Sequence, residues 1–324
     1  MEFKPIIQLK TWLDMEFAVG CPYSCAYCFR VDDGNFDLNK PKTVICPGAL
    51  VEELEKSPLF IPDMTHLSIS GTGSDGFVRQ NIKNTFEILS ILDKKRYKNS
   101  VAIVTKSRLS EKDIKVLESY KNLTLVIFVT YSEMPSSIEK VSNKTRIDTL
   151  KQLAQSHIKS VLYWRPIIEG INTSPKQLSK VLEIGEKYAD AFVISGLRYS
   201  DSISNNINKC GHTLPRIDWE PGQHKTVTKE TRKLILELYQ KKNCSKPLFY
   251  KSSCVISNFE KQPDFNAHWI KAEKNCSPFC PSDQKDICKK QSQRGWANDI
   301  ADIPSELSRE QATYYRQKHR LPIR

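Results

Sequence analysis

Three cysteines near the N-terminus are the residues of this chain best suited to metal chemistry. Cys21, Cys25 and Cys28 follow one another with the spacing C-x3-C-x2-C. Thiolates at this spacing can hold three irons of a cubic [4Fe–4S] cluster, and the motif then supplies no ligand to the fourth iron. Catalytic metal sites keep such an open position for substrate or cofactor. The alternatives are disulfide bonds or a structural zinc ion, although zinc needs a fourth ligand and no His or Cys follows within fifteen residues.

A second group of cysteines lies in the C-terminal third of the chain. Cys254 is followed by Cys276, Cys280 and Cys288, which form a C-x3-C-x7-C pattern. Four thiolates suit either an auxiliary iron–sulfur cluster or a tetrahedral zinc ion. An auxiliary cluster would pass electrons or hold substrate, whereas zinc would fasten the tail. We therefore predict a second metal site and leave the identity of its metal open.

The elements that must position these residues alternate between strands and helices. Short β-rich runs predict strands at 11–19, 65–70, 101–105, 123–131, 160–165 and 191–195. Apolar residues at helical spacing predict helices at 50–55, 82–92, 114–120, 147–153, 178–188 and 228–242. Ser110, with Asp113 three residues later, and Ser174, before Pro175, are start signals for two of them. The Ser/Asn-rich stretch 201–208 is expected to be a loop.

Alternation of this kind predicts an α/β fold with a parallel sheet. Eight strand–helix units close a barrel, so six predict a partial (βα)6 TIM-like barrel with a Cys-rich C-terminal extension. We expect residues 1–204 to form the barrel and residues 205–324 to form a basic Cys-rich region. Active sites of such folds lie at the C-terminal ends of the strands. The first cysteine motif directly follows the first predicted strand, which is where chemistry is expected.

At this motif the sequence resembles the radical S-adenosylmethionine (SAM) superfamily. Its signature, C-x3-C-x-aromatic-C after the first strand of a partial barrel, matches Cys21, Cys25, Tyr27 and Cys28. The resemblance covers roughly residues 11–200. It implies a [4Fe–4S] cluster whose open iron binds SAM, and cleavage of SAM to a 5′-deoxyadenosyl radical that abstracts hydrogen from a substrate. It also implies an external electron donor such as a flavodoxin or ferredoxin, and it makes Tyr27 the candidate catalytic residue.

The resemblance also indicates where SAM is bound. The family has a Gly-Gly-Glu-like stretch after strand two, where backbone groups meet the methionine ammonium, and the corresponding segment here is 70–75. Lys106, after strand three, is expected to pair with the SAM carboxylate. Strand four ends in hydroxyl side chains that suit the ribose or the carboxylate. The complete predicted cofactor-binding set is Ser70, Gly71, Gly73, Asp75, Lys106, Thr130, Ser132, Arg165 and Ser195.

Within the superfamily, short stretches are similar to the branch of spore photoproduct lyase and DNA-repair-photolyase-like proteins. They include 105–107, 128–132, 146–157 and 165–172. Two positions depart from the lyase. Phe29 stands beside the last cluster cysteine, where an aromatic hydroxyl would be needed, and strand two ends in Ser70, where the lyase has a hydrogen-donating cysteine. The branch fits the sequence, but the thymine-dimer reaction does not.

Composition and charge narrow the class of protein and of substrate. Of 324 residues, 39% are hydrophobic and 27% are charged, which excludes a disordered or fibrous chain. The longest apolar run is too short to span a membrane and no signal peptide is recognisable, so we expect a cytoplasmic protein. The net charge is +12, and from residue 205 onward 22 Lys and Arg face 13 Asp and Glu. Tail aromatics lie among these cations, an arrangement that suits single-stranded nucleic acid but is also common in protein cores.

The sequence therefore predicts a radical SAM enzyme acting on nucleic acid or a nucleotide-derived substrate. Two alternatives remain open at this point. One is a radical SAM enzyme that modifies a ribosomal peptide or a small metabolite. The other is a nucleic-acid-binding module that is stabilised by its metals and has no catalytic activity. The oligomeric state is not indicated by the sequence.

Overall fold

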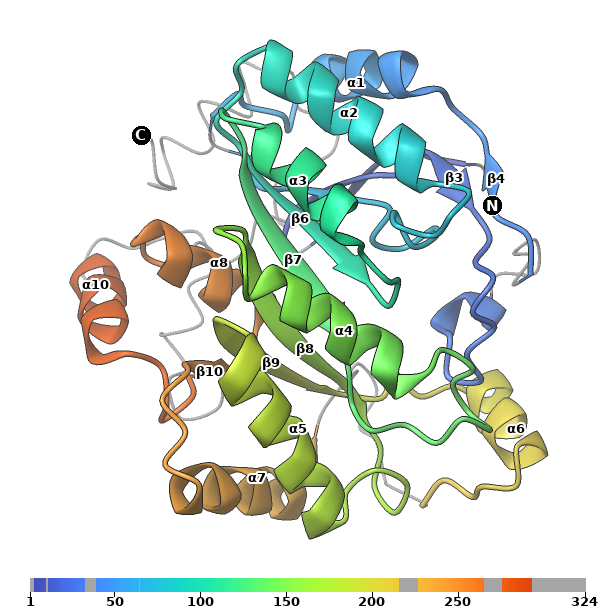
Figure 1. Ribbon diagram of the computed structural model, residues 1–324, viewed down its shortest axis with the longest axis vertical. Coiled ribbons are helices and arrows are strands. Elements are labelled where there is room, and N and C mark those ends of the chain that lie inside the picture. The colour runs from blue at the N-terminus through green and yellow to red at the C-terminus, as the bar shows by residue number, and fades with distance from the viewer. Residues whose placement is uncertain are drawn as a thin grey trace.

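The chain forms one large, mostly parallel β-sheet with helices packed on it (Figure 1). The computed structural model describes residues 3–9, 11–32, 39–63, 65–215, 227–264 and 276–292. In spatial order the strands are β1 (Ile6–Gln8), β2 (Leu13–Met15), β5 (Leu67–Ile69), β6 (Ser100–Thr105), β7 (Thr124–Thr130), β8 (Lys159–Ile167), β9 (Ala191–Gly196) and β10 (Leu248–Phe249). Only β1 runs antiparallel to its neighbour in this sheet. A short antiparallel pair, β3 (Ala18–Val19) and β4 (Lys42–Thr43), stands beside it.

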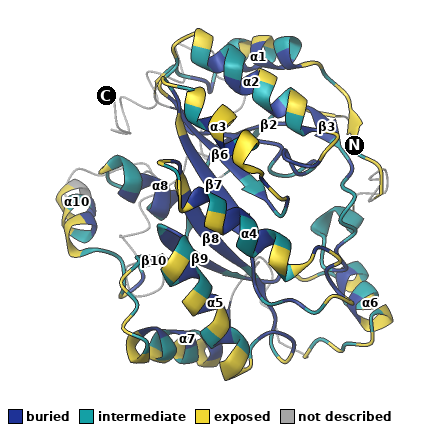
Figure 2. Cartoon of the chain, in the orientation of Figure 1, coloured by how far each residue is buried: buried dark blue, intermediate teal, exposed yellow. Residues whose placement is uncertain are grey.

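Six helices cover one face of the sheet and bury the larger hydrophobic core (Figure 2). They are α1 (Pro47–Lys56), α2 (Ile82–Lys94), α3 (Glu111–Ser119), α4 (Asn143–Leu153), α5 (Pro175–Tyr188) and α7 (Lys229–Lys241). Each contributes apolar side chains at helical spacing, such as Leu178, Val181 and Leu182 of α5. Alternate residues of the strands meet them, because neighbouring side chains of a strand point to opposite faces. The open-barrel α/β fold predicted from the alternation is confirmed.

The other face of the sheet is covered from the C-terminal region. Val126, Phe128, Tyr163 and Val193 pack there against residues of α8 (Ser252–Glu260). The last described helix, α10 (Ser282–Ser292), follows in the chain. Because β10 pairs with β9 and α8 fills this face, the region 205–324 contributes to the same sheet as the barrel.

Most predicted elements occur where the sequence places them. The expected strand 11–19 is divided into β2 and β3. The strands β1, β4 and β10 and the helices α8 and α10 were not predicted. Both helix start signals are confirmed as capping boxes, in which Ser110 pairs with Asp113 and Ser174 pairs with Gln177.

The loop expected at 201–208 is wrong, because this segment forms the helix α6 (Asp201–Lys209). Ser200 caps its first turn, and Ile203 and Ile207 lie one turn apart on its buried face. The low helix propensity of Ser and Asn is outweighed by burial of these two isoleucines. The boundary expected after residue 204 falls inside this helix.

Two further predictions concern membrane-spanning helices and the aromatic residues of the C-terminal region. In the described ranges, no helix is both long and apolar enough to cross a membrane. Several of the tail aromatics that we considered for nucleic-acid binding lie outside the described residues: Trp219, Phe265, Trp269, Trp296, Tyr314 and Tyr315.

Candidate functional site

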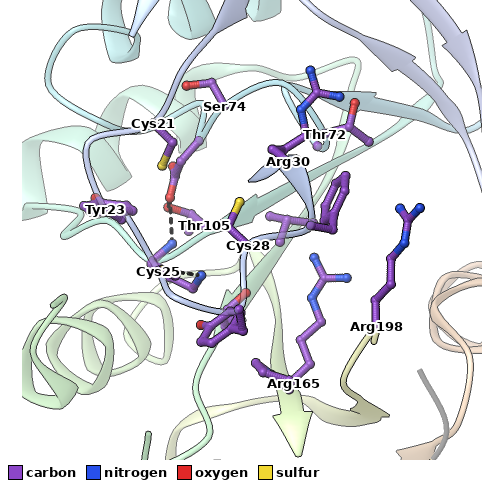
Figure 3. A pocket seen from close by; sticks show the side chains of 18 of the residues that line it. Cys21, Tyr23, Cys25, Cys28, Arg30, Thr72, Ser74, Thr105, Arg165 and Arg198 are labelled. Atoms are coloured by element: carbon purple, nitrogen blue, oxygen red, sulfur yellow. Dashed lines mark hydrogen bonds between the residues drawn. The ribbon is translucent and has the colours of Figure 1, made fainter. Parts of the chain in front are cut away.

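The three N-terminal cysteines lie on one tight loop after β3. Gly20 begins the loop at a φ of 93°, a conformation in which a side chain would be strained. The backbone N–H of Cys28 donates to the carbonyl of Cys25 at 2.9 Å, and that of Ala26 donates to Ile138 at 2.9 Å. Ala26 of this loop packs in the hydrophobic cluster that contains Ile203 and Ile207 of α6. All three cysteines line one pocket (Figure 3).

A lysine ammonium faces the buried thiol of this motif. Lys106, just after β6, places its Nζ 3.4 Å from Sγ of Cys25 and 4.9 Å from the ring centroid of Tyr27. Burial raises the pKa of Cys25 to about 11, and the Lys106 ammonium acts in the opposite direction. Burial, with the nearby Asp75 carboxylate, raises the pKa of Cys21 to about 12. The Cys21 and Cys25 thiols therefore favour the protonated form, and a metal that binds them must displace these protons.

The glycine-containing loop after β5 is held from inside the protein by two carboxyl groups. Asp14 accepts the N–H of Gly71 at 3.0 Å, and Glu16 accepts those of Thr72 and Gly73 at 2.7 Å each. Burial, reinforced by the adjacent Asp14, raises the pKa of Glu16 well above its ordinary value. A Cβ at Gly73 would overlap the Glu16 carboxylate and would come within 2.6 Å of the Ala18 carbonyl. Glycine at this position is therefore what allows the loop to lie against β2 and β3.

Asp75 joins this loop to the end of β6. Its carboxylate accepts the hydroxyls of Thr105 and Ser107 and the backbone N–H groups of Lys106 and Phe77, at 2.8 to 3.1 Å. The side chain is 6% exposed, and burial raises its pKa. Asp75 borders the pocket, but this many donors make it the residue that fixes Lys106 in place.

The pocket opens at the C-terminal ends of the parallel strands, as the sequence predicted. Of the predicted cofactor-binding set it is lined by Gly71, Asp75, Lys106, Thr130 and Arg165, together with Tyr27. The others lie in adjoining positions outside the lining: Ser70, Gly73, Ser132 and Ser195. Ser132 is buried, and its carbonyl oxygen accepts the side-chain amide of Asn172 at 2.7 Å.

Several residues in and behind the pocket were not predicted from the sequence. Arg30 and Arg198 line the pocket with Arg165, and Figure 3 shows the three around the side on which Cys28 lies. Behind Lys106, the buried Glu139 carboxylate lies 3.7 Å from its Nζ and pairs with the fully buried Arg146. Arg146 is one of several polar residues of α4, and only its burial distinguishes it from them. Its pairing with Glu139 was therefore not predictable from the sequence.

The donor set fits an iron–sulfur cluster. Three thiols from one loop share a pocket, Lys106 offers positive charge to the thiolate of Cys25, and the hydroxyl of Tyr27 is buried without a hydrogen-bond partner among the described residues. All ten cysteines are free thiols, so no disulfide competes for the motif. A cluster bound here would take Cys21, Cys25 and Cys28 as ligands and would leave one iron facing the pocket.

Solved structures share this fold. A mutant of spore photoproduct lyase with bound AdoMet and a dinucleoside spore photoproduct aligns with a TM-score of 0.53 at 14% identity, over 71% of this chain and 73% of that chain. A second mutant of that lyase gives 0.54 at 13% identity, over 74% and 76%. Streptococcus suis SuiB bound to S-adenosylmethionine gives 0.52 at 11% identity, over 82% of this chain and 57% of that chain. No protein-family model and no curated protein sequence matches the chain. The chain thus has the fold of these radical SAM enzymes.

Proposed function

We propose that the protein is a radical SAM enzyme that carries a [4Fe–4S] cluster on Cys21, Cys25 and Cys28. The observation that carries the proposal is that the three thiols open into one pocket at the C-terminal ends of the strands, in a fold shared with SAM-binding enzymes. When bound, the cluster supplies the electron that cleaves SAM to a 5′-deoxyadenosyl radical, which abstracts hydrogen from the substrate. The protein binds and orients the reactants and keeps water away from them.

Different residues around the pocket suit different chemical groups of SAM. The N–H groups of Gly71, Thr72 and Gly73 are occupied by the two buried carboxyl groups, so the backbone groups with which this loop would meet a ligand are its carbonyl oxygens. Carbonyl oxygens suit the SAM ammonium. Lys106, held in place by Asp75, is the cation for the SAM carboxylate, and Thr130 offers a hydroxyl at the end of β7. Tyr27 lies between Cys25 and Cys28 in the chain and lines the pocket, where it would contact a bound cofactor.

The basic character of the pocket favours an anionic substrate. Arg30, Arg165 and Arg198 line it with Lys106, while its acidic lining residue, Asp75, is buried and occupied by hydrogen bonds. Guanidinium groups bind phosphate through paired hydrogen bonds. We infer that the substrate is nucleic acid or a nucleotide-derived molecule. One fold neighbour, SuiB, was solved bound to its precursor peptide SuiA, which keeps a peptide substrate as the second candidate.

The reaction itself differs from that of the lyase with the similar fold. Phe29 lines the pocket beside Cys28, with the Arg198 guanidinium 5.3 Å from its ring centroid, and it has no hydroxyl to relay hydrogen. Ser70 ends the β5 segment and lies outside the lining. We therefore propose hydrogen abstraction without the thiol donor of the lyase. The free thiols of all ten cysteines suit a reducing cytoplasm, where a flavodoxin or ferredoxin would supply the electron.

Binding of a labelled single-stranded oligonucleotide at several salt concentrations tests the substrate class. Phosphate-driven affinity falls steeply as salt rises, whereas binding of an uncharged peptide does not. Oligonucleotide binding that is absent at low salt would reject the nucleic-acid proposal and leave SAM cleavage untouched.

A further inference from the structure

A buried ion pair lies next to the lysine of the pocket. Glu139, in the loop between β7 and α4, is 2% exposed, and its partner Arg146 in α4 is fully buried. One carboxylate oxygen of Glu139 pairs with Arg146, and the other, Oε2, lies 3.7 Å from Nζ of Lys106. A buried ion pair stabilises a fold little compared with apolar residues of the same size, so this pair calls for a role other than stability.

The segment that carries Glu139 is fastened to the cysteine loop. The carbonyl of Ile138 accepts the backbone N–H of Ala26, the residue after Cys25, at 2.9 Å. The N–H groups of Ile138 and Glu139 both donate to the carbonyl of Pro135 at 3.0 Å, which closes a turn. Ile138 and Ala26 also pack in one hydrophobic cluster. The position of Glu139 is therefore fixed relative to the cysteine motif.

Arg146 is held from two further sides and keeps its charge. Its guanidinium donates to the side-chain oxygen of Asn143 and lies 5.8 Å from the ring centroid of the buried Tyr131. Burial lowers the pKa of Arg146 to about 10, which leaves it charged at neutral pH. Burial also raises the pKa of Glu139, but the two cations against its carboxylate favour the ionised form.

The charges of these three groups leave one positive charge for the pocket. A lone Glu139 carboxylate would cancel the charge of the Lys106 ammonium. Because Arg146 neutralises this carboxylate, Glu139 can anchor Lys106 without cancelling its charge. The anchored ammonium is the one that lies 3.4 Å from Sγ of Cys25 and 4.9 Å from the ring centroid of Tyr27.

We propose that Glu139 and Arg146 are a positioning pair for Lys106. Glu139 anchors the ammonium beside the cysteine motif, and Arg146 keeps the charge of the group positive toward the SAM carboxylate. Neither side chain lines the pocket, so both act through Lys106. The choice of SAM as the anion rests on the proposed function, whereas the anchoring of Lys106 does not.

Equilibrium binding of SAM to the anaerobic, cluster-loaded protein tests the pair through a double-mutant cycle. Glu139→Gln and Arg146→Met are introduced together, because removal of one partner would leave the other charge buried and unpaired. This pair variant should bind SAM about 3-fold or more weakly than the parent, since residues in one charge network are coupled. In a Lys106→Ala chain the same two changes should cause no further loss. Equal losses with and without Lys106, as a purely structural role would give, would overturn the proposal, and so would an unchanged affinity in the parent.

Methylation of lysines in the chain without cluster or SAM makes the test independent of the proposed function. Formaldehyde and cyanoborohydride methylate neutral amines, a form that a neighbouring carboxylate disfavours. Relative to the exposed Lys112 of α3, Lys106 should be methylated about 3-fold or more faster in the pair variant than in the parent. An unchanged ratio would overturn the proposal. A raised ratio in a protein whose parent binds no SAM would support the anchoring and reject the proposed function.

A milder variant covers the case in which the pair variant does not fold. Glu139→Asp keeps the negative charge beside Arg146 but is one methylene shorter, so its carboxylate cannot reach both cations as Glu139 does. It should weaken SAM binding and speed the methylation of Lys106, both by less than the pair variant. A folded Glu139→Asp protein that equals the parent in both measurements would overturn the proposal.

Discussion

Gly73→Ala is the substitution whose effect can be worked out most fully from the structure. The added methyl group would meet the buried Glu16 carboxyl and the carbonyl of Ala18, so the loop after β5 must move away from β2. Overpacking of a dense interior costs about 1–3 kcal/mol. Each hydrogen bond from Thr72 or Gly73 to Glu16 that breaks adds about 0.5–1.5 kcal/mol. We expect a total decrease of about 2–4 kcal/mol in the free energy of unfolding.

Thermal unfolding of the anaerobic holoprotein measures this decrease. At about 2.1 cal/mol/K of unfolding entropy per residue, about 2–4 kcal/mol corresponds to a decrease in Tm of about 3–6 °C for this chain. Gly48→Ala is the matched control, because nothing lies within 4 Å of its added methyl group in α1 and alanine favours the helix by up to about 1 kcal/mol. A Gly73→Ala protein as stable as the Gly48→Ala control would refute the close approach of this loop to Glu16.

Three further predictions concern charges at and behind the pocket. Lys106→Ala should lower SAM affinity by about 10-fold or more, the equivalent of about 1.5–3 kcal/mol, with iron content retained, whereas Lys112→Ala on α3 should leave equilibrium SAM binding unchanged. The raised pKa of Glu16 lets the folded protein keep a proton that the unfolded chain loses, so the free energy of unfolding should fall as pH rises above about 5. Glu16→Gln removes this titration and should make Tm less dependent on pH. A pH dependence equal to that of the parent would show that Glu16 titrates normally. The double variant Arg165→Ala, Arg198→Ala should bind a single-stranded oligonucleotide with a weaker dependence on salt. The slope of log affinity against log salt concentration should become shallower by about 0.7 for each phosphate that the two arginines neutralise in the parent. A slope equal to that of the parent would place the nucleic acid elsewhere.

The strands and helices were predictable from the sequence wherever the local residue pattern and the tertiary packing agree. The strands at 101–105 and 123–131 are apolar runs buried on both faces, and the capping boxes at Ser110 and Ser174 are local hydrogen-bond patterns. Prediction from the sequence failed for α6, where two isoleucines among Ser and Asn become a helix face only against the cysteine loop. It also failed for β10, a two-residue strand that is defined only by pairing with β9.

The cysteine motif and the strand ends that form the site were predictable from the sequence. The side chains that contact them from distant parts of the chain were not. The cysteine spacing is local, so its pocket was predictable. Glu139 and Arg146 act through the fold: they lie 33 and 40 residues after Lys106 and form a buried ion pair behind its ammonium. Likewise, nothing in a Gly-Thr-Gly segment indicates that its N–H groups turn inward to Asp14 and Glu16, because that depends on the register of β2 against β5.

The central claim is that the three N-terminal cysteines support reductive cleavage of SAM, and product analysis under anaerobic conditions tests it most directly. The reconstituted protein, given SAM and a strong reductant, should form 5′-deoxyadenosine and methionine, and the Cys46→Ser protein should do the same. The variant with Cys21, Cys25 and Cys28 changed to Ala should form neither product while remaining folded. Formation of 5′-deoxyadenosine by that triple variant, or its absence from a parent protein that holds the cluster, would contradict the account.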